Sequence, residues 1–124
     1  PLDGRSSWPA LTGDAALAPE PVFCEYYGCD TQGPHRMVRH QQYKLCYYHG
    51  QGLELFDMDQ DPKETTNLAG DAAYQKVLGE LLQILMRDWD PEQVSREIRA
   101  SQNRRTYLGE SLRAIMAKGY KSAT

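Results

Sequence analysis

Residues 36–57 read RMVRHQQYKLCYYHGQGLELFD and decide the fold class, because they hold three candidate strands in close succession. The strands are expected at residues 36–40, 43–48 and 53–56, and Gly50-Gln51-Gly52 marks a turn before the last of them. The connections are far shorter than the roughly dozen residues that a parallel crossover needs. The stretch therefore predicts antiparallel hairpins.

Upstream of this stretch, residues 22–27 alternate in the period of two that is typical of a strand. Val22, Cys24 and Tyr26 fall on one face, and the residues between them fall on the other. This adds a fourth strand to the sheet. Residues 1–20 are rich in Pro, Gly, Ala, Ser and Asp without an apolar period, which predicts an extended connection that follows a surface supplied by another part of a longer protein.

Downstream, a polar loop over residues 57–70 leads to a long amphipathic helix that Asp71 is expected to cap. Its apolar residues recur at i, i+3, i+4 and i+7 and are Tyr74, Val77, Leu78, Leu81, Leu82, Leu85, Met86 and Trp89. Gly79 costs about 1 kcal/mol relative to Ala. Burial of the large side chains, at roughly 1.5–3 kcal/mol each, outweighs that cost.

A second helix is predicted to begin at Asp90-Pro91, with Asp at the N-cap and Pro at the first helical position. Its apolar face is interrupted by the polar residues 99–106, RASQNRRT, and ends near Gly119. The face comprises Val94, Ile98, Tyr107, Leu108, Leu112, Ile115 and Met116. The chain is thus expected to be α+β, with a four-stranded antiparallel sheet packed against a long amphipathic helix and followed by a tail helix.

Composition excludes several classes of function. The chain has 124 residues, 40% hydrophobic and 25% charged, with a net charge of -3, so it lacks the basic surface typical of nucleic-acid binding. No apolar run approaches the roughly 20 residues that span a bilayer. The chain opens at Pro1 without a signal-like segment, and we interpret it as a piece of a longer protein. Three cysteines, an odd number, favour a reducing, cytoplasmic compartment over a disulfide framework.

Two metal sites can be drawn from the sequence, and neither fits well. Cys24 and Cys29, followed by His35 and His40, imitate zinc ligands, but Cys24 lies inside a strand instead of a tight ligand pair.

Asp57, Asp59 and Asp61 imitate the start of a calcium loop. Such a loop needs Gly at its sixth position and Glu at its twelfth, where this sequence has Pro62 and Leu68. A solvated acidic turn is the better interpretation.

The other candidates have plain structural alternatives. Cys46 with His35, His40 or His49 suggests a catalytic dyad, yet no glycine elbow accompanies it. The tyrosines of the strands suit either a cation cage or ordinary sheet packing; they are Tyr26, Tyr27, Tyr43, Tyr47 and Tyr48. Glu25 stands among apolar and aromatic residues and needs a partner, either a salt bridge or solvent.

The order of the segments resembles the C-terminal part of a sulfatase. Three blocks carry this resemblance: Asp3-Gly4-Arg5-Ser6 with Pro9, Leu11 and Gly13; Met37-Val38-Arg39 with Tyr43-Lys44-Leu45; and Leu55-Phe56-Asp57 with Asp61-Pro62, Glu64 and Asn67-Leu68-Ala69. The tail, with Trp89-Asp90, residues 98–102 and Arg104-Arg105, is similar to choline-sulfatase-like and phosphonate-monoester-hydrolase-like enzymes. Gln41-Gln42 stands where the usual hairpin has Arg-Gly.

The resemblance implies a subdomain of an alkaline-phosphatase-like fold in a metal-dependent hydrolase. The family's formylglycine, made from the Cys of C-x-P-x-R, and its divalent metal (calcium) would lie in a catalytic part upstream, because this chain holds no such motif. No catalytic or metal-binding residue is therefore assigned to this chain. Glu25 is the one candidate substrate contact, since its strand end looks like the place where choline sulfatases approach a cationic substrate.

We divide the chain into a connection over residues 1–20, a sulfatase C-terminal subdomain over 21–89, and a tail helix over 90–124 that is a possible oligomerisation segment. The expected function is a non-catalytic part of a sulfuric-ester or phosphonate-monoester hydrolase, which closes the active-site cleft and helps to assemble subunits. The expected partners are the catalytic domain and further copies of the protein, with no nucleic acid and no membrane. The alternative is a free-standing interaction domain derived from a sulfatase.

Overall fold

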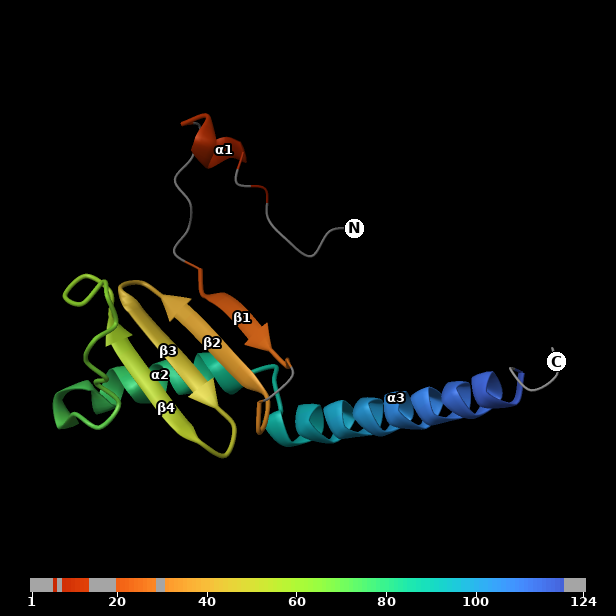
Figure 1. Ribbon diagram of the computed structural model, residues 1–124. Coiled ribbons are helices and arrows are strands. Elements are labelled where there is room, and N and C mark those ends of the chain that lie inside the picture. The colour runs from red at the N-terminus through yellow and green to blue at the C-terminus, as the bar shows by residue number, and fades with distance from the viewer. Residues whose placement is uncertain (1–5, 7, 14–19, 29–30, 120–124) are drawn as a thin grey trace.

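The computed structural model describes residues 6, 8–13, 20–28 and 31–119. Figure 1 shows one sheet with a helix behind it and a long second helix that runs away from both. The elements are, in order, α1 (Trp8–Leu11), β1 (Val22–Tyr26), β2 (His35–His40), β3 (Tyr43–Tyr48), β4 (Gly52–Asp57), the 3₁₀ turn η1 (Ala72–Tyr74), α2 (Gln75–Met86) and α3 (Pro91–Gly119). The predicted α+β fold is confirmed.

The sheet has the order β1-β2-β3-β4, and every neighbouring pair is antiparallel. Two residues join β2 to β3, and the first of them, Gln41, has a φ of 54°, in the left-handed region that glycine adopts more easily. Gly50 and Gly52, with φ of 73° and 138°, make the next turn possible. Short loops thus produce the meander that the strand spacing predicted.

The core lies between one face of the sheet and α2. Val38, Leu45 and Leu55 are fully buried there, one from each of the three strands β2, β3 and β4. They meet the buried residues of the helical side, Leu78, Leu81, Leu85 and Trp89. At roughly 1.5–3 kcal/mol for each large side chain, this cluster is the main source of stability in the fold.

The predicted helix differs from the observed one at both ends. Asp71 does act as a cap, since its carboxylate accepts a hydrogen bond from Ala73 N, but the first residues form the 3₁₀ turn η1. α2 then ends at Met86, three residues before the end of the apolar stripe. Trp89 leaves the helix and still packs into the core, with 7% of its surface exposed. The apolar spacing therefore continues past the last helical residue, so it overestimates the length of the helix.

The outer edge of β4 is closed by the segment that follows it. Asn67 Oδ1 accepts a hydrogen bond from Leu55 N, and its Nδ2 donates to Leu53 O. Leu68 N donates to Leu55 O in the same way. These contacts satisfy strand-edge groups that would otherwise invite pairing with another strand. This is the physical task of the sequence block that ends in Asn67-Leu68-Ala69.

α3 begins as predicted and then leaves the body of the fold. Asp90 Oδ1 accepts hydrogen bonds from Glu92 N and Gln93 N, so it caps the helix N-terminus. The helix continues without a break through the polar residues 99–106. Within the described residues, no helix is both long enough and apolar enough to cross a membrane.

Among the described residues before the sheet, Trp8–Leu11 form the short helix α1, where the sequence predicted an extended connection. Its Trp8 and Leu11 are largely exposed. Asp3, Gly4 and Arg5 of the first sequence block lie outside the described residues.

Candidate functional site

A buried arginine organises the end of the sheet nearest α3. Arg36 lies on the α2-facing side of β2, and only 6% of its surface is exposed. Its Nη1 donates to Leu85 O at 2.7 Å and to Asp88 Oδ1 at 2.9 Å. Leu85 belongs to the last turn of α2, where backbone carbonyls lack helical partners and attract positive charge. The guanidinium therefore joins the sheet to the end of the helix.

Glu25 is the cross-strand neighbour of Arg36 and completes its charge balance. Arg36 Nε lies 3.1 Å from Glu25 Oε1, close enough for an ion pair although not aligned for a hydrogen bond. Tyr27 donates its hydroxyl proton to the other oxygen of Glu25 and accepts a hydrogen bond from Trp89 Nε1 at 3.0 Å. We call Glu25, Tyr27, Arg36, Asp88 and Trp89 the Arg36 cluster.

Aromatic rings cover the guanidinium from two sides. The centre of the Arg36 guanidinium lies 4.5 Å from the Phe23 ring centroid and 5.6 Å from that of Trp89, as in cation–π contacts. Its hydrogen bond and charge hold the pKa of Asp88 below its usual value. Burial, followed by the hydrogen bond to Glu25, raises the pKa of Tyr27. The cluster therefore keeps Asp88 charged and Tyr27 neutral near pH 7.

The structure shows the partners of Glu25, which the sequence left open, and it adds Arg36, which the sequence analysis missed. Glu25 needed a partner, and the structure provides Arg36 and Tyr27, which is the salt-bridge alternative. Its assignment to a substrate stays a prediction. The sequence analysis missed Arg36 as a functional residue, although its alternation with Val38 and His40 placed it on the core face, where an arginine is unusual.

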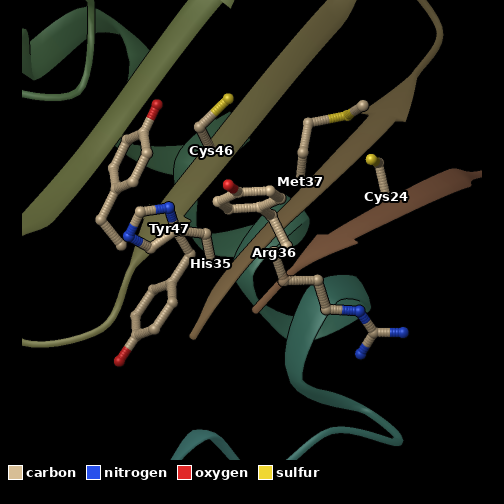
Figure 2. A pocket seen from close by; sticks show the side chains of 8 residues that line it. Cys24, His35, Arg36, Met37, Cys46 and Tyr47 are labelled. Atoms are coloured by element: carbon tan, nitrogen blue, oxygen red, sulfur yellow. The ribbon is translucent and has the colours of Figure 1, made fainter. Parts of the chain in front are cut away.

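On the opposite face of the sheet, no helix formed by the described residues covers the strands, and the surface is hollowed. A cavity of about 250 Å³ lies over β1, β2 and β3. Figure 2 shows Cys24, Met37 and Cys46 side by side on this face while Arg36 points away from them. We call this side of the sheet the open face; its cavity is lined by Cys24, Tyr26, His35, Met37, Cys46 and Tyr48, with Arg36 and Tyr47 at its margin.

Aromatic contacts shape the rim of this cavity. His35 meets Tyr48 edge to face, with ring centroids 4.7 Å apart, and lies 6.3 Å from Tyr26. Tyr48 donates its hydroxyl proton to Glu54 at 2.7 Å. Burial, together with this bond, raises the pKa of Tyr48. Tyr47 instead packs against Trp89 on the core side. The predicted aromatic group is thus split between two faces and forms no single cation cage.

The zinc candidates are separated by the sheet. Cys24 and His35 line the cavity of the open face, whereas His40 lines a hollow beside α2. Cys29 lies outside the described residues. Among the described side chains, no group of three His, Cys, Asp or Glu is arranged to hold a metal ion.

The carboxylates of the acidic turn accept hydrogen bonds from backbone N–H groups of the same turn. Asp57 Oδ1 accepts from Asp59 N and Gln60 N, and Asp61 Oδ2 accepts from Thr65 N and Thr66 N. These oxygens stabilise the loop in place of a cation. The solvated-turn interpretation fits Asp59 and Asp61, whereas Asp57 is buried with only 7% of its surface exposed. The described side chains of the turn form no group that could hold the implied divalent metal.

Cys46 lacks the features of a nucleophile. Burial raises the pKa of its thiol, whereas catalysis needs a lowered one. His49, one of its predicted bases, instead contacts Tyr47 through Nδ1 at 3.3 Å and Glu92 through Nε2 at 3.5 Å. The contacts of His49 therefore agree with the plain structural alternative to a catalytic dyad.

Comparisons with known proteins identify the subdomain. Residues 1–90 match the family described as N-sulphoglucosamine sulphohydrolase, C-terminal. A Δ4,5-hexuronate-2-O-sulfatase from Bacteroides thetaiotaomicron is 38% identical over 81 residues, which are 62% of this chain and 17% of that protein. A choline-sulfatase from Rhizobium meliloti is 32% identical over 114 residues, or 90% of this chain and 22% of that protein.

Solved structures agree with the sequence relatives. A 2-O GAG sulfatase shares 38% identity, with a TM-score of 0.59 over 66% of this chain and 19% of that one. A protein solved with its substrate D-glucosamine-2-N,6-O-disulfate shares 30% identity, with a TM-score of 0.62 over 73% of this chain and 22% of that one. The chain spans about a fifth of the length of the curated relatives it matches.

Proposed function

The chain belongs to the N-sulphoglucosamine sulphohydrolase C-terminal family and is a sulfatase C-terminal subdomain, and from that premise we propose that it serves a sulfuric-ester hydrolase without catalysing the reaction itself. Its two tasks are to complete the wall of the active-site cleft, through the open face, and to help assemble subunits, through α3. The catalytic domain of the same protein supplies the formylglycine and the divalent metal.

The open face carries this proposal. α2 covers only one side of the sheet, and on the other side Val22 and Tyr26 are 63% and 55% exposed. A hollow lined mainly by apolar and sulfur-containing side chains lies beside them. Exposed apolar surface of this kind marks an interaction site. The catalytic domain, which makes up most of the length of the relatives, is the occupant we assign to it.

The substrate class follows from the relatives. Sulfate esters of sugars and of choline are named in their descriptions, so a sulfate ester of a small polar molecule is the proposed substrate, with a phosphonate monoester as the other candidate. The contacts of Glu25 with Arg36 and Tyr27 support a positioning role for that carboxylate. A direct contact with a cationic substrate and a cytoplasmic location stay predictions.

Thiol protection tests the proposed docking in the full-length protein. Cys24 is exposed on the open face of this chain. A catalytic domain seated there should slow the alkylation of Cys24 by maleimide about tenfold or more relative to the isolated 124-residue chain, as measured by mass spectrometry. Equal rates in the two proteins would contradict the docking.

A charge placed on the same face tests its functional consequence. Met37→Glu in the full-length protein should lower kcat/KM for an aryl sulfate at least about tenfold, because a carboxylate would be buried against the catalytic domain. Gln83→Glu, which adds the same group to the exposed side of α2, is the matched control and should stay within about twofold. The isolated 124-residue chain should show no turnover in either form.

A further inference from the structure

The second half of α3 exposes apolar side chains that the described part of the fold does not cover. Tyr107, Ile115 and Met116 are 70%, 68% and 68% exposed, and Leu108 and Leu112 are each 55% exposed. Figure 1 shows this part of the helix far from the sheet and from α2. In proteins most of the stability of such a helix comes from packing of its apolar face and little comes from helix propensity. The described residues of this chain therefore do not supply the surface that covers its apolar side.

The spacing along α3 is that of a helix that pairs with another helix. Starting at Val94, steps of four and three residues alternate without a break to Ile115. The positions reached are Val94, Ile98, Ser101, Arg105, Leu108, Leu112 and Ile115. Such a repeat of 3.5 residues keeps one seam facing a partner helix in a coiled coil. Five of its seven positions are apolar, and the two polar ones lie together in the middle.

The charges along the helix indicate the direction of the partner. The N-terminal part holds Asp90, Glu92 and Glu97 against Arg96 and Arg99, whereas Arg104, Arg105, Arg113 and Lys118 follow against the single acidic Glu110. A parallel copy would set like charges side by side and Arg105 against Arg105. An antiparallel copy sets the strongly basic C-terminal half against the weakly acidic N-terminal half, which is more favourable than placing the two basic halves together.

We propose that α3 binds α3 of a second copy of this chain as an antiparallel two-helix coiled coil. The inference deepens the proposed role in subunit assembly and rests on it. α3 lies outside residues 1–90 that match the family, and the match to the choline-sulfatase, which covers 90% of the chain, extends into it.

One alignment of the two helices pairs the seam residues well and also places opposite charges side by side. Placing Ile115 opposite Ile98 of the second copy also places Leu112 opposite Ser101, so that a large side chain meets a small one. In the same register Lys118 lies beside Glu97 of the second copy on the flank of the seam. Glu97 is held on the helix surface by a hydrogen bond from Gln93 Nε2 at 2.9 Å.

The middle layer pairs Arg105 with Leu108 of the second copy. The aliphatic stem of Arg105 can cover the leucine while its guanidinium stays in water. A polar residue in a seam lowers affinity and fixes register, which suits an interface that must choose one alignment. Val94 and Ile98, which are half-buried by the chain itself, contribute only their remaining surface.

Charge reversal in the full-length protein tests the register. Lys118→Glu and Glu97→Lys should each weaken self-association about tenfold in sedimentation equilibrium at low salt, since the two-fold axis repeats every contact. The double variant, Lys118→Glu with Glu97→Lys, should restore the affinity to within about twofold. Glu110→Lys, on the side of the helix opposite Leu108, is the matched control and should change little.

A seam variant tests the pairing itself. Leu112→Glu should weaken self-association on the order of a hundredfold or more. The proposal would be overturned by a monomeric full-length protein, or by a self-association that Leu112→Glu leaves unchanged. Equal affinities of the single and double charge variants would also overturn it. Protection of Cys24 and the activity per catalytic domain do not depend on this helix, so they report separately on the proposed function.

Discussion

Arg36 is stable in a nearly dry site because each side of its guanidinium meets a different kind of partner. Carbonyl and carboxylate oxygens take its charge at one end of α2, Glu25 balances it across the strands, and two aromatic rings close over its faces. A buried charge is costly unless it is paired in this way. The sequence showed that Glu25 needs a partner. It could not identify Arg36, because cross-strand neighbours depend on a register that single residues do not encode.

Substitutions within the Arg36 cluster should separate its structural role from a role in substrate binding. Arg36→Ala in the 124-residue chain should cost about 2–3 kcal/mol in the free energy of unfolding, since it removes a buried side chain and leaves Leu85 O without its partner. Glu25→Gln should cost about 1–2 kcal/mol, because Asp88 and Leu85 O still hold the arginine. Urea unfolding followed by tryptophan fluorescence measures both.

Arg39→Ala serves as the control for these two variants, because Arg39 lies on the same strand with an exposed side chain and should change stability by no more than about 0.5 kcal/mol. If Glu25 instead contacts the substrate, as predicted from the sequence, Glu25→Gln should leave the free energy of unfolding unchanged. It should then raise KM of the full-length protein without changing kcat.

α2 illustrates how far periodicity can predict an element. The 3.6-residue stripe identified the helix and the side that faces the sheet, because both follow from burying apolar side chains on one face. It placed the C-terminus too late, since Trp89 is apolar and buried without being helical. The strands followed from their period of two, while the closure of the β4 edge by Asn67 was not predicted, because it depends on the path of a loop that carries no period.

A substitution at Gly79 tests whether the stability of α2 contributes to the stability of the core. A methyl group added there meets no atom within 4 Å, so Gly79→Ala should stabilise the 124-residue chain by about 0.5–1 kcal/mol through its helix propensity. Gly109→Ala in α3 is the matched control, because Gly109 also has open space around it. It should leave the midpoint of global unfolding unchanged, since that part of α3 frays independently. Equal gains from both variants would mean that the two helices unfold as one unit.

The whole molecule divides into a body with its own core and a projecting helix. The body buries its large side chains between residues 34 and 89, and the described residues of α3 beyond Gln102 contribute none of them. Sequence patterns could predict both parts, because each follows from local spacing. They could not predict what covers the open face or the seam of α3, because those answers lie in surfaces of other molecules.

Removing residues 103–124 from the isolated chain tests this division. At a concentration low enough to keep the chain monomeric, the shortened form should unfold in urea within about 0.5 kcal/mol of the intact one, because the deleted helix supports no buried contact of the body. Removing residues 86–124 is the contrasting deletion, since it takes away Trp89 and the partner carboxylate of Arg36, and it should cost at least about 3 kcal/mol. If the shorter deletion were also strongly destabilising, the tail helix would have to pack on its own body, and the same result would remove the free surface on which the pairing of α3 with a second copy depends.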